Sequence, residues 1–353
     1  MKKINLRYST IILTLVLVFS MTACNSSQSE SVPSQDGTEL QVLPSQEPSS
    51  QEPSSTPDAD PSLANGEKPQ VFMITDITPE GLMMAYEALG REAVGENVAI
   101  KISTGEPGGT HFLAPDLIKG FVQSVDGTIV ECNTAYGGNR ANTAMHYQVA
   151  EDHGFTAIAP VVIMDESDSM TIPVVGGTHL TENYVGARFE EFDFHVVLSH
   201  FKGHAMGGFG GALKNLSIGY ASSKGKSWIH TGGTSTSGIM GDQNTFLESM
   251  AEAAKSVVDS AGDDILYINV MNHLSVDCDC DSNPADPTMA DIAILASLDP
   301  VALDQACVDL VYAAPDGQDL IERIESRNGI LTIEHAEKIG LGSREYELVN
   351  IDD

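Results

Sequence analysis

Short apolar runs alternate with longer amphipathic segments over residues 70–353. Apolar runs of strand length predict strands at residues 71–75, 97–103, 128–132, 157–164, 195–199, 265–271 and 291–297. The amphipathic segments predict helices at 79–93, 114–124, 142–153, 243–261 and 299–313, and a short one that ends at Leu216. Because strands alternate with helices, the sequence predicts an α/β fold with a doubly wound, mostly parallel sheet and helices on both faces.

The first residues have the pattern of a targeting segment. Three basic residues precede the apolar run 11–19, which is too short for an ordinary membrane span. Ala23-Cys24 resembles the lipobox of bacterial lipoproteins. This resemblance implies that residues 1–23 are a signal peptide and that Cys24 carries acyl chains, palmitate among them. It further implies an extracytoplasmic protein whose partner is the cell membrane, held through the lipid at Cys24. The alternative is a secretory signal with an incidental cysteine.

Residues 24–69 differ in composition from the C-terminal part of the chain. They are rich in Ser, Pro, Gln and Glu and contain no aromatic residue, so they predict a disordered tether in front of the domain at 70–353. The chain is strongly acidic, with a formal net charge of −32. This charge argues against nucleic acid and anionic lipid surfaces as partners.

The segment from His200 to Lys214 is the strongest candidate site. It follows the strand predicted at 195–199, and α/β proteins bind ligands where a strand opens into a turn. In an extended segment, His200, Lys202 and His204 share one face, which suits a common ligand or metal. Gly207 and Gly208 in the turn allow the backbone to approach a ligand closely. The alternative is that each histidine is a core residue.

A second cluster is Asp277-Cys278-Asp279-Cys280-Asp281. Buried thiols among carboxylates need a cation, and Cys278 and Cys280 would be soft ligands for zinc or iron. With His200 and His204 they form the predicted metal set. The two cysteines are one residue apart, so we expect no easy disulfide between them. The alternative is an exposed acidic loop with free thiols.

A third group lies after two other predicted strands. Arg140 suits a carboxylate or phosphate ligand, with Asn139 beside it and His146 on the next predicted helix. Glu106 lies in a Gly-rich turn after the strand at 97–103 and is expected at the same edge of the sheet. The alternative is a glycine turn with a helix-face histidine.

These motifs carry a resemblance to a family. From Lys101 to Asp309 the chain resembles the domain-of-unknown-function family 362 (DUF362). The matching segments are 105–108, 133–136, 153–155, 200–219, 278–280, 291–297 and 299–302, together with His146. Many members carry an insert with four-cysteine clusters, but residues 230–238 contain no cysteine here. A Cys₄ iron–sulfur cluster is therefore not expected.

The chain also resembles, more distantly, the N-terminal domain of nickel-pincer lactate racemases. That resemblance implies that Lys214 attaches the cofactor, that His230 binds nickel and that His204 is a base. A second base of that family would fall near Asn139, and an amide cannot accept the proton there. Two-base racemisation is therefore not expected. The apolar signal implies export in an unfolded state, before a cofactor made in the cytoplasm could be held, so we expect zinc or iron more than nickel.

The candidate residues support three hypotheses. The first is a surface enzyme with metal-assisted proton transfer on a small anionic or hydroxy-acid-like molecule, in which His204, Lys214 and His146 are catalytic and Lys214 and Arg140 bind the anion. The second is a lipoprotein that binds a metal or ligand in the same pocket without catalysis. The third is a redox protein that uses its paired thiols.

Overall fold

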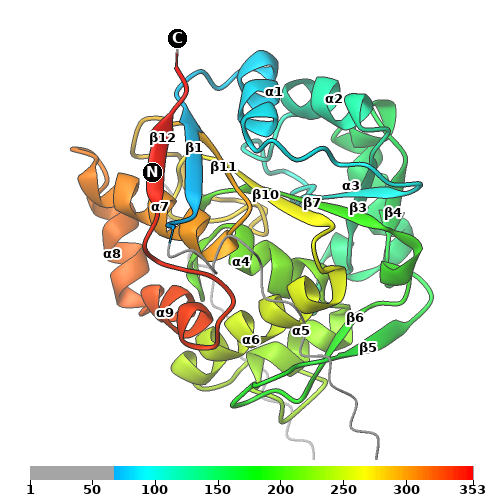
Figure 1. Cartoon of the computed structure of the whole chain (residues 1–353). Helices are drawn as coiled ribbons and strands as arrows, with labels where there is room; N and C mark the ends of the chain where they lie inside the picture. Colours follow the sequence, from blue (N-terminus) through cyan, green and yellow to red (C-terminus); the bar gives the residue numbers. More distant parts are fainter. Residues whose placement is uncertain (1–66, 353) are drawn as a thin grey trace, which may run out of the picture. The chain divides into compact units, whose positions relative to one another are not determined.

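The computed structural model describes residues 67–352. The predicted signal peptide, Cys24 and the tether up to residue 66 lie outside the described residues. Within this range no helix is both long and apolar enough to cross a membrane. Figure 1 shows a central sheet with helices on both of its faces, as the α/β pattern predicted.

The central sheet has eight strands in the order β12-β1-β11-β10-β7-β2-β3-β4. Its strands are β1 (Gln70–Ile74), β2 (Val98–Lys101), β3 (Thr128–Glu131), β4 (Val161–Ile163), β7 (Phe194–His200), β10 (Ile265–Val270), β11 (Ile294–Ser297) and β12 (Glu347–Asn350). β11 runs antiparallel to both of its neighbours, and the other pairs are parallel. The sheet is therefore mostly parallel, as predicted. Because β2, β3, β7 and β10 run in one direction, their carboxyl ends meet at one edge.

Two apolar cores lie on the two faces of the sheet. One face is covered by α1 (Pro79–Ala88), α2 (Pro115–Ser124) and α3 (Thr143–Asp152). The other face packs against α4 (Ala212–Lys214), the π-helical turn Asn215–Gly219, α6 (Gln243–Ala261), α7 (Pro300–Ala313), α8 (Gln318–Ser326) and α9 (Ile330–Lys338). α7 begins with a side-chain cap, since Asp299 accepts hydrogen bonds from Val301 N and Ala302 N at 2.8 and 2.9 Å.

Several elements were not predicted. They are the hairpin of β5 (Ser169–Pro173) and β6 (Glu182–Gly186), the hairpin of β8 (Lys202–His204) and β9 (Gly208–Gly210), the helices α5 (Ser223–His230), α8 and α9, and the edge strand β12. The predicted strand 157–164 is shorter, because residues 155–157 form a 3₁₀ turn before Val161. β8 and β9 are three residues long and contain glycine, and β6 does not alternate between polar and apolar residues, which hides their strand character. β5 does alternate from Ser169 to Ile172, but it is short and ends at a proline.

Candidate functional site

A cavity of about 290 Å³ lies at the edge where the parallel strands end. Its wall comes from the ends of β2, β3 and β7, from the β8–β9 hairpin and α4, from α5, and from the loop at 277–281. The residues predicted for the site that line it are Arg140, His200, Lys202, His204, Lys214, His230, Cys278 and Cys280. The lining lacks Asn139, His146, Glu106, Gly207 and Gly208. The histidine-rich turn and the cysteine pair therefore meet at one rim of the sheet.

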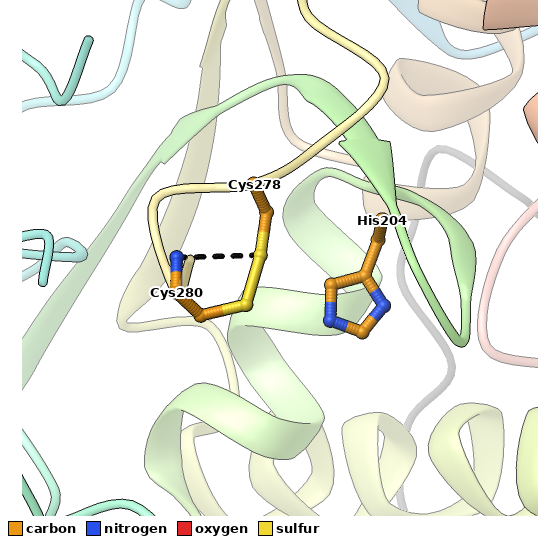
Figure 2. Close-up of side chains that lie close together, drawn as sticks. All are labelled: His204, Cys278 and Cys280. Atoms are coloured by element: carbon orange, nitrogen blue, oxygen red, sulfur yellow. Dashed lines mark hydrogen bonds between the residues drawn. A yellow bond between two sulfur atoms is a disulfide. The ribbon is translucent and has the colours of Figure 1, made fainter. Parts of the chain in front are cut away.

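The loop with the cysteines is held against the hairpin by direct backbone contact. Gly203 N donates to Ser275 O at 2.8 Å, and a Cβ at Gly203 would stand 2.3 Å from Val276 O. Only glycine permits this approach. The contact brings His204 and both cysteines together, with one ligand atom of each within 4.8 Å of the others (Figure 2).

Cys278 and Cys280 form a disulfide, which corrects the sequence expectation. The chain turns around Asp279 so that the Cα atoms of the two cysteines are 5.2 Å apart, within the usual range for a disulfide. Neither sulfur is a thiolate while this bond exists, so neither can bind a metal in that state. The metal set predicted with Cys278 and Cys280 therefore requires their reduction.

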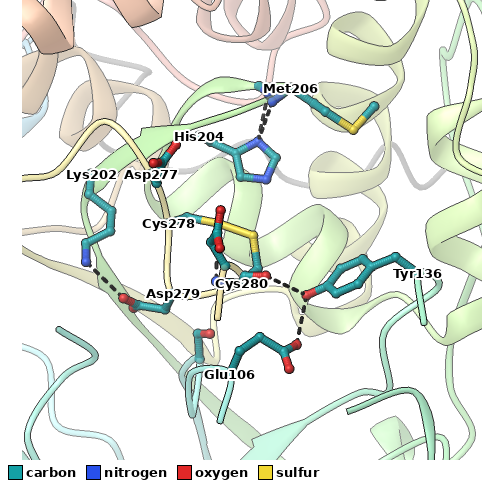
Figure 3. The surroundings of a disulfide bond; sticks show 12 residues. Glu106, Tyr136, Lys202, His204, Met206, Asp277, Cys278, Asp279 and Cys280 are labelled. Carbon is teal, nitrogen blue, oxygen red and sulfur yellow. Dashed lines mark hydrogen bonds and ion pairs between the residues drawn. A yellow bond between two sulfur atoms is a disulfide. The ribbon is translucent and has the colours of Figure 1, made fainter. Parts of the chain in front are cut away.

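Asp279 anchors the loop from the inside (Figure 3). Its carboxylate accepts from Lys202 Nζ at 2.9 Å and from His200 Nδ1 at 2.9 Å. Burial opposes the charge of Asp279, but His200 and Lys202 together lower its pKa to about 2. His200 Nε2 in turn donates to Asn272 O at 2.7 Å. Both ring nitrogens of His200 are thus engaged, and this histidine positions Asp279 rather than offering a lone pair to a metal.

The other two histidines in the cavity lining, His204 and His230, carry their proton on different ring nitrogens. His204 Nδ1 accepts from Met206 N and Gly207 N at 3.2 and 2.8 Å, so the proton of the neutral ring is on Nε2, which faces the disulfide (Figure 2). Burial, with Lys214 nearby, lowers the pKa of His204 well below its usual value. His230 Nδ1 is 2.7 Å from Lys226 O and donates to it, which leaves a free lone pair on Nε2. His204 is therefore an N–H donor, and His230 is the histidine suited to bind a metal.

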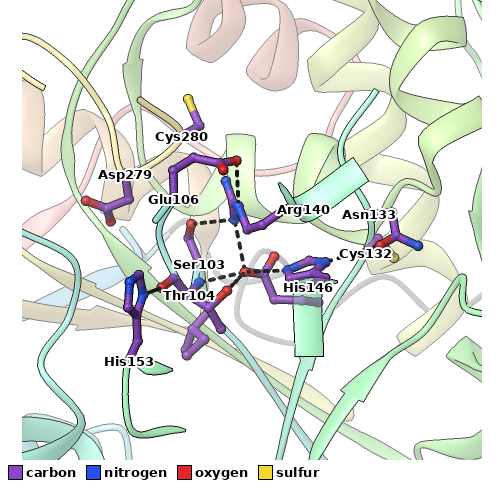
Figure 4. Close-up of polar contacts among 12 residues, drawn as sticks. Ser103, Thr104, Glu106, Cys132, Asn133, Arg140, His146, His153, Asp279 and Cys280 are labelled. Atoms are coloured by element: carbon purple, nitrogen blue, oxygen red, sulfur yellow. Dashed lines mark hydrogen bonds and ion pairs between the residues drawn. The ribbon is translucent and has the colours of Figure 1, made fainter. Parts of the chain in front are cut away.

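A buried ion-pair network forms the floor next to the cavity (Figure 4). Arg140 contacts Glu106 at 2.8 Å and Glu131 at 3.2 Å, and Lys101 lies 3.6 Å from Glu131. Although burial opposes it, Lys101 and Arg140 hold the pKa of Glu131 well below its ordinary value. His146 is buried behind this network, with Nε2 3.7 Å from Glu131 Oε1. Arg140 is consequently satisfied by carboxylates of the protein, and His146 does not reach the cavity lining.

Of the 18 lysines and arginines in the sequence, five line this cavity. Three of them, Lys101, Arg140 and Lys202, pair with buried carboxylates. Lys226 is buried and donates only to backbone carbonyls, at 2.5 Å to Ala221 O and 3.5 Å to Cys132 O. Between residues 67 and 352, no carboxylate forms an ion pair with Lys214 or Lys226. The cavity therefore holds two amines that form no ion pair with the described residues. The lining also carries the carboxylates of Glu131, Asp277, Asp279 and Asp281, and Asp279 acts on Lys214 from beyond ion-pair distance.

Lys214 has an unusual environment for an amine. It lies at the end of α4, where Asp304 accepts from Ala212 N and Leu213 N at 2.8 and 2.9 Å and fixes the turn. Burial is the main reason that its pKa falls to about 8, and Arg140 contributes to the same shift. Sequence reasoning found Lys214 but not Lys101, Glu131 or Lys226. Lys101 and Glu131 could have been found, because each is a charged residue at the end of an apolar strand, where the site was expected.

Several solved structures are distantly similar to this chain, whereas none of the curated proteins matches it. The lactate racemase apoprotein from Thermoanaerobacterium thermosaccharolyticum is similar with a TM-score of 0.42 and 15% identity, over 68% of this chain and 56% of that one. A structural genomics protein from Thermotoga maritima is similar with a TM-score of 0.38 and 13% identity, over 74% and 58%. The chain thus spans little more than half the length of each.

A family model gives the more specific result. The model described as "Domain of unknown function (DUF362)" matches residues 98–309, which is more than half of the chain. The matched range contains both sides of the cavity, from β2 to α7. The chain therefore belongs to the DUF362 family, as the motifs around His200–Gly219 and Cys278–Cys280 had indicated.

Proposed function

We propose that this domain binds a small anionic molecule, of the carboxylate or hydroxy-acid class, in the lysine-lined cavity. The observation that carries the proposal is the pair of amines, Lys214 and Lys226, which line the cavity without a carboxylate partner in residues 67–352. Removing an unpaired charge from water costs roughly several kcal/mol unless a counter-charge compensates it. An anionic ligand beside Lys214 and Lys226 would supply this counter-charge.

The cavity also offers groups for a hydroxyl or a second oxygen on such a ligand. His204 presents an N–H to the cavity, and a neutral donor can bind a hydroxyl or a carboxylate oxygen equally. An amine with a pKa near 8 can exchange a proton with a bound hydroxy acid at neutral pH. Binding is therefore the primary proposal, and proton transfer by Lys214 would make the same site an enzyme.

Calorimetric titration of the purified full chain tests the proposal, with lactate, succinate and inorganic phosphate as ligands. We expect Lys214→Met and Lys226→Met each to weaken the binding of the best anion by roughly tenfold, as expected for a lost charged hydrogen bond. Lys119→Met is the matched control, because Lys119 is exposed on α2 and does not line the cavity. If no anion binds more tightly than a neutral analogue, or if all three variants behave alike, the proposal is wrong.

We further propose that the domain lies outside the cytoplasm and that a lipid on Cys24 anchors it to the cell membrane. The lipobox-like sequence before Cys24 supports this location. Cell fractionation of the wild type and of Cys24→Ala tests it. We expect the wild type in the membrane fraction and the variant in the soluble extracytoplasmic fraction. A wild type that is soluble, or a variant that stays on the membrane, contradicts the anchor.

A metal centre is the second candidate function. The grouping of Cys278 and Cys280 within 4.8 Å of His204 favours it, with zinc or iron as the expected metal once the disulfide is reduced. His204 would join as a ligand only by moving its proton off Nε2, at the expense of the hydrogen bonds that its Nδ1 accepts from Met206 N and Gly207 N. His230, with its lone pair on Nε2, is the best additional ligand in the cavity. Titration of the reduced chain with zinc tests this candidate. Stoichiometric binding that is lost in Cys278→Ser and weakened in His230→Ala supports it, and no binding to the reduced chain refutes it.

A further inference from the structure

The disulfide lies in the wall of the same cavity that holds the unpaired lysines. Cys278 and Cys280 both line the cavity, together with Lys214 and Lys226. A disulfide that only stabilises a fold has no reason to face a ligand cavity. One that reacts with a small molecule must do so, because thiol–disulfide exchange needs access for the attacking sulfur.

The loop around the disulfide does not depend on the S–S bond for its shape. Asp279 is fixed by Lys202 and His200, and Asp277 accepts from Arg323 Nη1 at 3.0 Å. The backbone is held as well, since Glu106 N donates to Asp279 O at 2.8 Å. The bond also spans a sequence separation of only 2, so it restricts the unfolded chain very little. The loop can therefore keep its place when the disulfide opens.

The two sulfurs are not equivalent. As whole residues, Cys278 is 8% exposed and Cys280 is somewhat more exposed, although both belong to the partly buried rim of the cavity. Cys280 N donates to Cys278 Sγ at 3.3 Å, and the Nε2–H of His204 points toward the disulfide. Both donors favour negative charge on a sulfur, and the backbone donor is directed at Cys278. An incoming thiolate therefore meets Cys280, and Cys278 is the better leaving group.

We propose that the Cys278–Cys280 pair is a redox centre that exchanges with a small thiol carrying one or more carboxylates, which Lys214 and Lys226 hold in the cavity. The selectivity for an anionic thiol rests on the proposed anion site, and the exchange chemistry rests on the disulfide itself. The cavity of about 290 Å³ limits the partner to a small molecule rather than a protein cysteine.

The exchange balances without any further cofactor. The thiolate of the small molecule attacks Cys280 Sγ, the S–S bond breaks, and its electron pair stays on Cys278 as a thiolate. A second small thiol then attacks the mixed disulfide and releases Cys280 as a thiolate. The small molecule leaves as its symmetric disulfide, so two thiols are oxidised and the protein disulfide is reduced to two thiols. The protons of the small thiols go to solvent or to the two cysteines.

Three small thiols of different charge test the proposal on the purified full chain. Mercaptosuccinate is anionic, 2-mercaptoethanol is neutral and cysteamine is cationic. With rates normalised to the thiolate fraction of each reagent, we expect mercaptosuccinate to reduce the Cys278–Cys280 disulfide at least about tenfold faster than cysteamine. Lys214→Met should reduce this ratio several-fold, and the exposed-lysine control Lys119→Met should leave it unchanged.

A trapping experiment separates exchange from anion binding. In Cys278→Ser the remaining Cys280 should form a stable mixed disulfide with mercaptosuccinate, and peptide mass mapping should locate the adduct at Cys280. Cys280→Ser, which leaves the buried Cys278, should trap several-fold less. If no thiol opens the wild-type disulfide in the folded protein, the redox centre is refuted while anion binding can still be measured by calorimetry. If the disulfide opens but the three thiols react alike, the proposed charge selectivity fails.

Discussion

Replacing Lys214 by methionine should stabilise the ligand-free protein at neutral pH. Methionine keeps much of the length and apolar volume of the lysine stem but removes its charge. Burial lowers the pKa of Lys214 from 10.5 to about 8, which means that the folded state disfavours the ammonium form. A shift of this size corresponds to about 3 kcal/mol of unfolding free energy, and water in the cavity reduces it. We therefore expect Lys214→Met to gain up to about 3 kcal/mol at pH 7.

The pH dependence identifies the cause of this gain. Below pH 8 the lysine is protonated in both states, and the full cost of burying its charge falls on the folded protein. Between about pH 8 and 10.5 the folded state loses the proton while the unfolded chain keeps it, so the cost disappears as the pH rises. The advantage of Lys214→Met over the wild type should consequently shrink across this range and vanish above it.

Urea unfolding of the wild type, Lys214→Met and the exposed control Lys119→Met at about pH 7, 9 and 10.5 measures this difference. A saturating anion should reverse the order at pH 7, because it stabilises only the protein that retains the amine. The reasoning is refuted if Lys214→Met is less stable than the wild type at pH 7 without ligand. It is also refuted if its advantage is the same at all three pH values.

The same site supports three shorter predictions. Reduction of the disulfide should lower the unfolding free energy by about 2 kcal/mol or less in urea titrations, because the closed loop is so short; a larger loss would mean that the bond holds the loop in place. Glu131→Gln should cost about 3–5 kcal/mol in the same assay, since it leaves Lys101 and Arg140 with less buried counter-charge; a neutral effect would contradict the network. Gly203→Ala should cost about 1–3 kcal/mol and weaken anion binding, because its Cβ meets Val276 O at 2.3 Å; unchanged binding in calorimetry would show that the hairpin contact does not shape the cavity.

The sheet, and the edge of it at which the cavity lies, could be predicted because both follow from the periodic pattern of apolar residues. The helix Gln243–Ala261 has the bounds that its amphipathic pattern predicted, and the strand at Phe194–His200 agrees with the apolar run centred on residues 196–198. Parallel strands bring their carboxyl ends together, so the convergence of the His200 turn with the cysteine pair is a consequence of the fold class. The family could also be predicted, because its motifs lie at these strand ends.

Hydrogen bonds and pairings inside the site were not predictable from spacing. The sequence does not reveal that both ring nitrogens of His200 form hydrogen bonds, one with the Asp279 carboxylate and one with Asn272 O. It also does not reveal that Arg140 forms ion pairs with carboxylates of the protein. The disulfide depends on a local turn around Asp279 that no pattern encodes. Lys226 was missed because its helix is short and its side chain points to the cavity from an element that the sequence did not predict.

The position of β1 has a consequence for how the chain matures. β1 lies between β11 and β12, so its two partners are residues 294–297 and 347–350, which are synthesised more than two hundred residues later. Pairings across such separations form slowly, and an unpaired strand invites contact with other chains. The first strand is therefore the last to be sealed into the sheet. Until the C-terminal segment has been made, residues 70–74 have neither of their two strand partners and depend on other contacts to avoid pairing with a second chain.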